Sequence, residues 1–584
     1  MRVRRVEIQN FRGIKSLDLR VPADKKFVCL IGPGDSTKST ILEAIHLALG
    51  ERWSLNLSDT DFYGSDIDQP LVIRVALADL PAEIKGHTLL GLHRSGIDAD
   101  GEWTHDPSDD VEECVIVQLR VDREMDPSWT IFRPGGAEET IIGTGIRRKF
   151  SVFKIDDRID NHLRWTRTSA LTRLTDSTHG TAATLATALV AARAAVSSSV
   201  TPELQALTDS IGARMSELGS GDFSDLKPGL DTSLASSGGN LALFEGDVPL
   251  TSFGLGTRRL AGIATQQMAS IDKSVILVDE VEHGLEPHRL VHLLKHLRSD
   301  SQHAQVFVTT HSPVAVEQLD SSDLAIIRCD AGAAVGRFVP ADLQFAQATL
   351  RGGPSAFLAK RVLVTEGKTE FGLLLGMIDD WDRHAVSANG PTSAANGVAV
   401  TNGGGSMAAD RAKVLAQFGY ETALVVDNDD RSIDTKVTAA TAEGVKAFRW
   451  QTGNATEDEL VSGVAAPLLT QLLQVAIETR VDDITVKSDL LNARTSEPVI
   501  TGLDVEYWIA TDGFTVEQAR SLIARAAKKS KWFKDIQYGR TLSTFVIANA
   551  TIYRDLELGK KLLEIKEFIY PLPPSSPATG KEES

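Results

Sequence analysis

Two acidic pairs in the second half of the chain have the spacing of a metal site. Glu366 ends an apolar run and Glu370 follows at a helical i, i+4 spacing, so both carboxylates can face one point. Asp427 and Asp429 end a second apolar run, and alternation along an extended backbone directs both to the same side. Several carboxylates can share a site only with a strong counter-charge, and oxygen ligands favour Mg²⁺ or Mn²⁺. Two such ions suit the activation of water for phosphodiester cleavage.

Two further residues are candidates for the same site. The acidic segment 456–460 opens the next expected helix, and Glu457 is its preferred metal ligand, with Glu459 second; a solvated helix start is the alternative. Lys534 is a candidate for neutralising charge on the reacting phosphate, and a solvated surface lysine is the alternative.

A phosphate-binding loop is expected near the N-terminus. Segment 32–40 lies between an apolar strand and an amphipathic helix, where backbone N–H groups and a helix N-terminus can face an anion. Thr37 stands where the pattern G-x-x-x-x-G-K-[ST] has its second glycine, so we expect an altered or weaker loop. Lys38 would reach the β- and γ-phosphates and Ser39 would hold Mg²⁺. The candidate nucleotide-binding residues here are Gly32, Gly34, Thr37, Lys38, Ser39 and Thr40.

Two later apolar runs end in residues that suit nucleotide hydrolysis. The run 275–278 is followed by Asp279, expected to assist Mg²⁺, and by Glu280, expected to orient or deprotonate the attacking water. His311 ends the next run, where a sensor of the γ-phosphate would be needed; a residue that caps a strand is the alternative.

Alternating strands and helices must position these residues. The pattern predicts an α/β fold with parallel sheets, in which active residues gather at the carboxyl ends of strands. Segment 165–240 has helical texture and predicts an insert that contributes a dimer contact. The expected strands are 3–11, 27–31, 71–78, 115–121, 129–133, 274–279, 305–310, 324–328, 361–365, 398–401, 422–426 and 447–450, with helices over 39–49 and 457–530.

Composition indicates a cytoplasmic globular protein of two or three domains. The chain has 584 residues, 42% of them hydrophobic and 24% charged. No apolar stretch is long enough for a membrane span, no secretory signal precedes the first strand, and three isolated cysteines match no zinc spacing. The net charge of −18 means that DNA contact would need a local basic strip. Candidate strips, each with a solvated face as its alternative, are 258–259, 528–534 and Arg540 with 560–561.

Residues 1–350 resemble the ABC ATPases, particularly their SMC-like branch. The phosphate loop, the Walker B pair Asp279–Glu280, a D-loop at 284–287 and the switch residue His311 occur in the order of that family, and the opening VEIQNFRGIKSLDL resembles its first hairpin. The resemblance implies that ATP is sandwiched between two protomers, so a homodimer or higher oligomer is expected. The nearest match to the signature motif that completes the partner's site is 251–258, which departs from LSGGQ and contains Ser252 and Gly254.

Residues 358–460 resemble the Toprim fold, and the whole chain resembles the OLD (overcoming lysogenisation defect) family. This resemblance implies DNA cleavage or nicking that depends on Mg²⁺ or Mn²⁺ and is controlled by ATP, often in defence against phage, with a helicase-like partner beside some members. The expected domains are an ABC ATPase in two parts (1–164 and 241–350) around the helical insert 165–240, a Toprim nuclease with a helical insertion (358–570) and a disordered tail (571–584).

Three other classes were weighed against an ATP-regulated endonuclease. A topoisomerase needs a nucleophilic tyrosine in a recognisable domain, and a primase usually has a zinc module; neither is evident. An SMC-like DNA-binding or repair ATPase without nuclease activity is the remaining alternative, and the joint presence of Glu366, Glu370, Asp427 and Asp429 argues against it.

Overall fold

The computed structural model describes residues 1–51, 55–86, 90–136, 139–150, 152–155, 160, 162–165, 169–171, 174, 201–219, 223, 225–231, 240–269, 274–299, 303–480 and 482–571. The chain divides into two compact units, Met1–Ala341 and Asp342–Ser584, called here the first and second unit. Among the described residues, no helix is long and apolar enough to cross a membrane.

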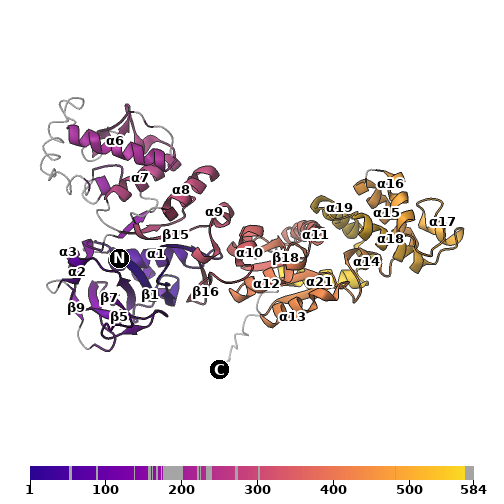
Figure 1. The fold of residues 1–584 in the computed structure, drawn as a ribbon, viewed down its shortest axis with the longest axis horizontal. Helices are drawn as coiled ribbons and strands as arrows, with labels where there is room; N and C mark the ends of the chain where they lie inside the picture. The colour runs from indigo at the N-terminus through magenta and orange to yellow at the C-terminus, as the bar shows by residue number, and fades with distance from the viewer. Residues whose placement is uncertain are drawn as a thin grey trace, which may run out of the picture. The chain divides into compact units, whose positions relative to one another are not determined.

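The first unit is built on a 14-stranded sheet with the order β10-β14-β15-β3-β16-β17-β2-β1-β4-β7-β5-β6, and β8 and β9 extend it beside β7 (Figure 1). The strands β10, β14, β15, β3 and β16 run parallel, whereas β1, β2, β4, β7 and β8 pair antiparallel. The strands are β1 (Arg2–Phe11), β2 (Ile14–Arg20), β3 (Phe27–Ile31), β4 (Leu71–Ala78), β5 (Ser95–Ile97), β6 (Trp103–Thr104), β7 (Glu112–Val121), β8 (Pro127–Phe132), β9 (Thr140–Ile141), β10 (Val152–Ile155), β14 (Ser274–Val278), β15 (His303–Thr309), β16 (Leu324–Asp330) and β17 (Ala333–Phe338).

The parallel strands β3 and β14 are buried along their whole length. Both faces of such strands are covered, which is why their sequences are continuous apolar runs. Ile41, Leu42 and Ile45 of the helix after β3 pack into the core that these strands share. The helices of this unit are α1 (Lys38–Leu49), α2 (Ala82–Lys85), α3 (Thr144–Arg148), α6 (Pro202–Glu217), α7 (Leu255–Ala269), α8 (Pro287–Ser299) and α9 (Pro313–Gln318).

The expected helical insert is only partly helical. Helix α6 confirms its helical texture over 202–217, but the helix prediction was wrong farther on. There β11 (Leu226–Asp231), β12 (Asn240–Glu245) and β13 (Val248–Pro249) form a small antiparallel sheet. Pro228 and Gly229 disfavour a helix, and pairing with β12 supplies the backbone bonds instead. The alanine-rich segment 186–197 lies outside the described residues.

The second unit contains a four-stranded, wholly parallel sheet in the order β19-β18-β20-β21. Its central strands pair with Thr365 beside Val425, so Glu366 and Asp427 follow at the same edge. Figure 1 shows helices packed around this sheet. The strands are β18 (Arg361–Thr365), β19 (Val398–Asn402), β20 (Glu421–Val426) and β21 (Lys446–Arg449), and the helices before, between and after them are α10 (Ala346–Gly352), α11 (Lys368–Ser387), α12 (Ala408–Gln417) and α13 (Asp434–Ala442).

The carboxyl-terminal part of this unit is helical and shares one core with the sheet. Helix α19 packs closely on α11, because small residues face each other: an added Cβ on Gly372 would lie 2.2 Å from the Ile536 carbonyl oxygen, and one on Gly376 would lie 1.8 Å from Ser543 Oγ. The α/β fold class with carboxyl-terminal helices is confirmed. These helices are α14 (Thr456–Val461), α15 (Ala466–Arg480), α16 (Asp483–Ala493), α17 (Val505–Ala510), α18 (Val516–Ser530), α19 (Ile536–Ala548), α20 (Ala550–Tyr553) and α21 (Glu557–Ile569).

Candidate functional site

The phosphate loop connects β3 to α1 and is closed around its own lysine. Lys38 is 3% exposed, and its Nζ donates to the carbonyl oxygens of Gly32 (3.1 Å) and Pro33 (2.9 Å) and to Ser36 Oγ (3.1 Å). Burial lowers the pKa of Lys38 to about 8. Helix α1 begins at Lys38, so Ser39 and Thr40 lie in its first turn. The lysine occupies polar contacts within the loop that it would exchange for phosphate oxygens.

Three loop residues, Gly32, Asp35 and Thr37, have positive-φ backbone conformations that favour glycine. Gly32 has φ +149°, and an added Cβ would lie 2.2 Å from the Ile327 carbonyl oxygen, so no side chain fits there. Thr37 has φ 68° and ψ 15°, the left-handed region that a β-branched residue rarely adopts. The backbone at Thr37 therefore keeps the shape expected of the missing glycine, at a cost in strain of about 1–3 kcal/mol. Gly34 has open space around its Cα.

Asp279 connects the phosphate loop to two strands. Its Oδ1 accepts hydrogen bonds from Ser39 Oγ (2.8 Å) and from Thr309 Oγ1 (2.6 Å) at the end of β15. The neighbouring Glu280 has φ 47°, its side chain is half exposed, and its N–H donates to the same Thr309 hydroxyl (2.7 Å). Hydrogen bonds to Asp279 and Thr309 therefore connect Ser39, Asp279 and Glu280 in the structure.

His311 is held by a residue that the sequence analysis did not single out. Its backbone N–H donates to Glu282 Oε1 (2.6 Å), and Thr310 Oγ1 donates to Glu282 Oε2 (2.6 Å). Glu282 thus joins the turn after β14 to the end of β15. Glu282 and Thr309 are polar residues that lie two positions from Glu280 and His311, and that proximity was the only signal in the sequence.

The candidate signature segment precedes and opens α7. Ser252 and Gly254 are exposed. The helix start packs on the turn after β14, since an added Cβ on Gly256 would lie 2.4 Å from the Gly284 carbonyl oxygen. Ser252 and Gly254 therefore directly precede a helix start that is fixed against this turn.

The basic strip predicted at 258–259 is not a DNA surface. Arg259 is fully buried, and its Nη2 donates to the carbonyl oxygens of Asp279 and Glu280. Arg258 Nη1 contacts both carboxylate oxygens of Asp160 at 2.8 and 2.7 Å. Consecutive residues on a helix face different directions, so a pair that is basic in sequence need not form a surface.

In the second unit, the carboxylates meet at the carboxyl ends of β18 and β20. Glu366 Oε2 accepts from the Asp427 N–H (2.9 Å), and Glu370 Oε2 accepts from the Gly367 N–H (2.9 Å). Thr456 Oγ1 lies 2.8 Å from Glu370 Oε1 and 2.9 Å from Asp427 Oδ1, and the Thr456 N–H also donates to that Asp427 oxygen. Thr456 is a second site residue that sequence reasoning missed.

The acidic site gathers several buried carboxyl groups. Glu370, Asp427 and Glu457 are 4%, 7% and 2% exposed, and among the described residues nothing donates to the buried Glu457 Oε1. Burial, with the nearby Glu370, Glu366 and Glu457, raises the pKa of Asp427 to about 8. Burial also raises the pKa of Glu366 and of Glu457. An unpartnered carboxylate oxygen among mutually repelling acids fits a divalent cation.

Lys534 is exposed and lies within electrostatic range of these acids. Burial alone would lower the pKa of Lys534, but the carboxylates of Glu457, Glu370, Asp427 and Glu366 raise it overall. In the described part of the chain, no three Asp, Glu, His or Cys side chains already converge as a ready metal-binding group. The carboxylate oxygens bond to Thr456 and to main-chain N–H groups instead, so these side chains would have to turn to bind an ion.

The second aspartate of the pair has a different partner. Asp429 Oδ2 accepts from Lys528 Nζ (2.9 Å), which also donates to Asp458 Oδ2 (3.2 Å). Asp429 nevertheless lies close enough to Glu366 to help raise the pKa of that residue. Glu459 Oε2, the second choice for a ligand, instead accepts from the Gln451 N–H and from Asn454 Nδ2.

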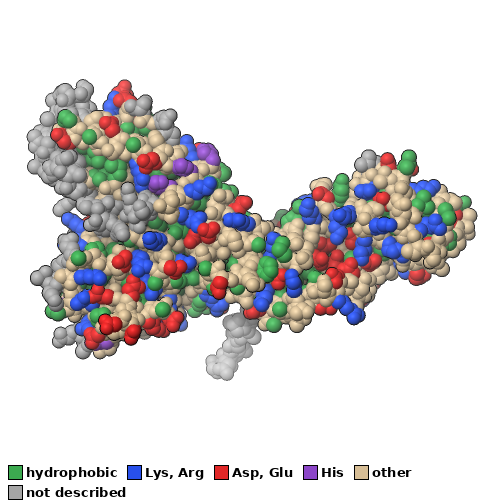
Figure 2. Space-filling model, in the orientation of Figure 1, with side chains coloured by type: hydrophobic (Ala, Val, Ile, Leu, Met, Phe, Trp, Pro, Cys, Tyr) green, Lys and Arg blue, Asp and Glu red, His purple; other side chains and the backbone are tan. Residues whose placement is uncertain are grey.

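Ion pairs also occupy much of the other predicted basic strips. Lys528 pairs with Asp429 and Asp458. Lys529 Nζ donates to the Asn492 carbonyl oxygen (2.8 Å), and Arg540 Nη1 pairs with Asp379 (2.6 Å). Lys560 and Lys561 pair with glutamates on their own helix. In Figure 2, acidic side chains gather on the second unit and are bordered by Lys and Arg. These strips therefore carry less free positive charge than their sequences indicate.

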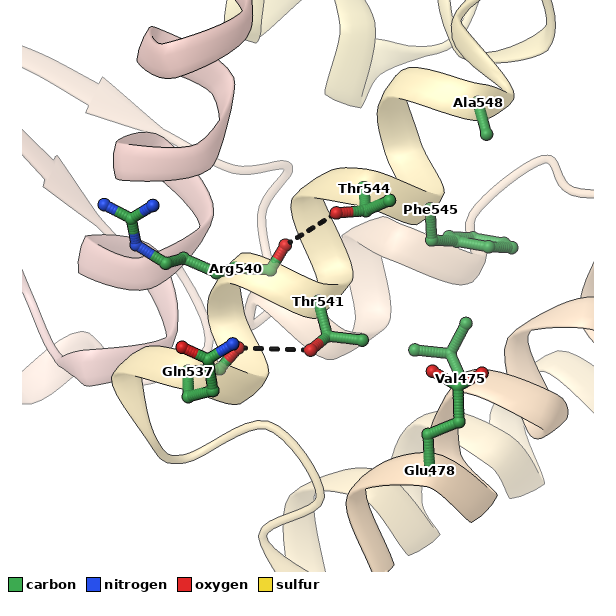
Figure 3. Close-up of a pocket in the computed structure, with 8 residues that line it drawn as sticks. All are labelled: Val475, Glu478, Gln537, Arg540, Thr541, Thr544, Phe545 and Ala548. Atoms are coloured by element: carbon green, nitrogen blue, oxygen red, sulfur yellow. Dashed lines mark hydrogen bonds between the residues drawn. The ribbon is translucent and has the colours of Figure 1, made fainter.

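A cavity of about 480 Å³ opens between α15 and α19 (Figure 3). Its lining includes none of the site carboxylates, and the Arg540 side chain points toward α11 rather than into the space. The cavity is thus separate from the acidic site. It is lined by Val475, Glu478, Gln537, Arg540, Thr541, Thr544, Phe545 and Ala548.

Known families match both units. Residues 27–317 match the family described as "AAA domain, putative AbiEii toxin, Type IV TA system", and residues 357–429 match the one described as "Overcoming lysogenization defect protein-like, TOPRIM domain". The chain therefore joins an ATPase domain to an OLD-like Toprim domain. The fusion of an ATPase domain to a Toprim domain, which the sequence predicts, is confirmed. No curated protein sequence matches the chain.

Several solved structures are similar to this chain. One is an SMC head bound to the C-winged helix domain of ScpA, with 14% identity, TM-score 0.38, and coverage of 59% of this chain and 98% of that chain. Another is the SMC head domain from Thermotoga maritima, with 14% identity, TM-score 0.30, and coverage of 58% and 100%. A third is a Pyrococcus furiosus Smc head domain with an extended coiled coil, bound to the C-terminal domain of ScpA, with 12% identity, TM-score 0.36, and coverage of 58% and 96%.

Proposed function

We propose that this protein is an ATP-regulated DNA endonuclease or nickase that depends on Mg²⁺ or Mn²⁺. The observation that carries the proposal is the buried acidic site of the second unit, where Glu457 Oε1 lacks a donor among the described residues. The proposed setting is anti-phage defence or DNA processing in the cytoplasm. The proposed partners are DNA, a second copy of the chain and a helicase-like protein.

The residues proposed to hold the ions are Glu366, Glu370, Asp427, Asp429 and Glu457. A divalent cation bound there supplies an activated water and stabilises the leaving oxygen. Thr456 orients Glu370 and Asp427 through its hydroxyl. Lys534 would neutralise charge on the phosphate. Catalytic roles are proposed for Glu366, Asp427, Asp429 and Lys534.

At the nucleotide site, Lys38 would bind phosphate, Ser39 and Asp279 would hold Mg²⁺, and Glu280 would act on the attacking water. His311 would sense the γ-phosphate. Ser252 and Gly254 would complete the site of a second subunit. ATP is proposed to regulate the nuclease rather than only to fuel it, since the loop is closed around Lys38 and Thr37 holds a strained backbone.

Supercoiled plasmid with Mg²⁺ or Mn²⁺ tests the nuclease assignment. We expect the double variant Asp427→Ala/Asp429→Ala to lose nicking and to keep ATP hydrolysis. We expect Glu280→Gln to lose ATP hydrolysis and still bind nucleotide. Nicking that survives in the double variant would overturn the metal assignment. A monomer in light scattering, with and without ATP, would contradict the two-protomer nucleotide site.

One observation favours a second candidate, a DNA-binding or repair ATPase without nuclease activity. The carboxylates are engaged by Thr456 and by main-chain N–H groups, so the acidic site has an internal structural use. That function predicts no cleavage by the wild-type protein with either metal and no binding of Mn²⁺ to the second unit. The plasmid assay and a Mn²⁺ titration followed by electron paramagnetic resonance therefore separate the two candidates.

A further inference from the structure

The turn that carries Glu280 is held from both sides. The Glu280 N–H donates to Thr309 Oγ1 at 2.7 Å, and the Glu280 carbonyl oxygen accepts from Arg259 Nη2 at 2.8 Å. The same Arg259 nitrogen donates to the Asp279 carbonyl oxygen. A single Arg259 nitrogen thus donates to the carbonyl oxygens of both adjacent acids.

This support matters because Glu280 has an unfavourable backbone conformation. Its φ of 47° lies in the left-handed region, which for a residue with a side chain is retained only where the surroundings impose it. The side chain remains half exposed and is 3.5 Å from His283 Nδ1, so the turn aims the carboxylate outward while fixing its backbone. Without the clamp, the turn would relax and the carboxylate would move.

Arg259 reaches this turn from α7, the helix whose N-terminal end follows Ser252 and Gly254. The same end packs against the turn a second time, since an added Cβ on Gly256 would lie 2.4 Å from the Gly284 carbonyl oxygen and one on Gly284 would lie 2.6 Å from Leu255 Cγ. Two close contacts, neither of which leaves room for a Cβ, therefore join the start of α7 to the turn after β14. A displacement of one has to move the other.

We propose that Arg259 is a positioning residue for ATP hydrolysis. It holds the Glu280 backbone in its left-handed conformation and transmits to Glu280 the contact that the start of α7 makes with a second subunit. The inference rests on the proposed function, in which Glu280 acts on the attacking water and Ser252 and Gly254 complete the other subunit's nucleotide site. It adds that assembly of one nucleotide site sets the geometry of the catalytic glutamate in the other.

The test compares Arg259→Lys with Arg147→Lys in the full chain. Arg147 is a matched control, because it is also a buried arginine of the first unit (3% exposed) that donates to a carbonyl oxygen, that of Gly50, but it does not touch the turn. A lysine keeps the charge, but its side chain is shorter and unbranched, so its Nζ does not reach the position from which Arg259 Nη2 donates. Both variants are expected to lose thermal stability.

The two variants should differ in catalysis. We expect Arg259→Lys to bind a fluorescent ATP analogue within about twofold of wild type, while its kcat falls by about tenfold or more, because misplacement of a catalytic group affects turnover before binding. Arg259→Ala should fall further, and Arg147→Lys should keep kcat within about twofold. An Arg259→Lys kcat within twofold of wild type overturns the inference, as does an equal loss in both variants.

A second measurement tests the coupling. Turnover per subunit should rise with protein concentration in the wild type as dimers form, and should stay flat in Arg259→Lys although light scattering still shows ATP-dependent dimers. Proportional rises in both proteins, or a flat wild type, would overturn the coupling. Glu280→Gln separates this failure from failure of the proposed function: if it hydrolyses ATP normally, the role of Glu280 itself is wrong.

Discussion

At the scale of single residues, the acidic site depends on Thr456. Its hydroxyl lies within hydrogen-bond distance of Glu370 Oε1 and Asp427 Oδ1 and accepts from Trp450 Nε1 at 2.8 Å. A buried polar atom that loses its partner retains the full cost of its desolvation. This one hydroxyl therefore affects both the stability and the aim of two proposed ligands.

Thr456→Val should lower the free energy of unfolding of the second unit by about 1–3 kcal/mol without metal, because the shape is kept and the hydrogen bonds are lost. Urea denaturation in EDTA measures the change. Thr438→Val is the control, since Thr438 is exposed and bonds only to the backbone of its own helix. Equal effects of the two substitutions would contradict the role of Thr456.

Thr37→Gly should tighten ATP binding severalfold, because glycine adopts the left-handed backbone of the loop without strain. Titration with a fluorescent ATP analogue measures the affinity. Thr37→Ala is the comparison: it removes the methyl group and the hydroxyl of Thr37 but keeps a side chain at positive φ. If alanine improves affinity as much as glycine does, the Thr37 side chain beyond Cβ and not backbone strain limits binding.

The raised pKa of Asp427 predicts how metal-free stability depends on pH. The pKa rises on folding from its ordinary 3.8 to about 8, so folding favours the protonated acid. Its stabilising contribution is complete below the unfolded pKa and is lost as pH rises through the folded pKa. In EDTA, the Tm of wild type should fall relative to Asp427→Asn between about pH 5 and about pH 8.5. A constant difference between the two proteins would refute the shift.

The same titration controls metal affinity. Binding of a cation requires the ionised carboxylate, so the Tm increase that saturating Mn²⁺ gives wild type should grow over the pH range in which Asp427 ionises. Asp427→Asn should show little increase at any pH.

At the scale of elements, the contact between α11 and α19, called here the α11–α19 seam, positions the acidic site. Glu370 lies in the first turn of α11, and Lys534 precedes α19. The packing of these two helices therefore sets the distance between the lysine and the acids. The approach is close because Gly372 lies against Ile536 and Gly539 with no room for a Cβ.

Gly372→Ala should therefore destabilise the second unit by about 1–3 kcal/mol and reduce nicking by moving Lys534 from the carboxylates. Gly502→Ala is the matched control, since an added Cβ there meets no atom within 4 Å. Urea unfolding and the plasmid assay under native conditions give the two readouts. Full nicking by Gly372→Ala would show that the seam does not position the site.

At the scale of the whole molecule, charge sets how DNA can bind. The chain carries a net charge of −18, and ion pairs occupy much of its candidate basic strips. An acidic site repels phosphate until a cation neutralises it. The cation should thus contribute to DNA binding as well as to chemistry.

Affinity for duplex DNA, measured by fluorescence anisotropy, should be weak in EDTA and should rise at least about tenfold with Mn²⁺ or Ca²⁺ at constant ionic strength. Asp427→Ala/Asp429→Ala should lose the metal-dependent part of this increase. Tight binding in EDTA by the wild type would place the DNA surface elsewhere.

The sequence by itself determined the order of the motifs and most of the elements around them. An apolar run that ends in an acid predicts a buried strand with a functional edge, and this local pattern located Asp279, Glu366 and Asp427. The alternation of strands and helices along the chain predicted the parallel sheets. The residues that end each strand follow directly from the sequence. The helix prediction failed at 226–231, where the strand depends on a partner farther along the chain.

Only the tertiary structure decided which side chains meet. Arg259 clamps the Glu280 turn, Thr456 joins Glu370 to Asp427, and Lys528 pairs with Asp429, and each contact connects residues that are distant in sequence. Spacing along the chain contains no information on such distances. Spacing also left open that Arg259 is fully buried under the Glu280 turn while the neighbouring Arg258 is partly buried and pairs with Asp160, since burial depends on what packs against each face of α7. The acidic pairs with which the sequence began are thus a local pattern, and their buried, mutually bonded arrangement is a property of the fold.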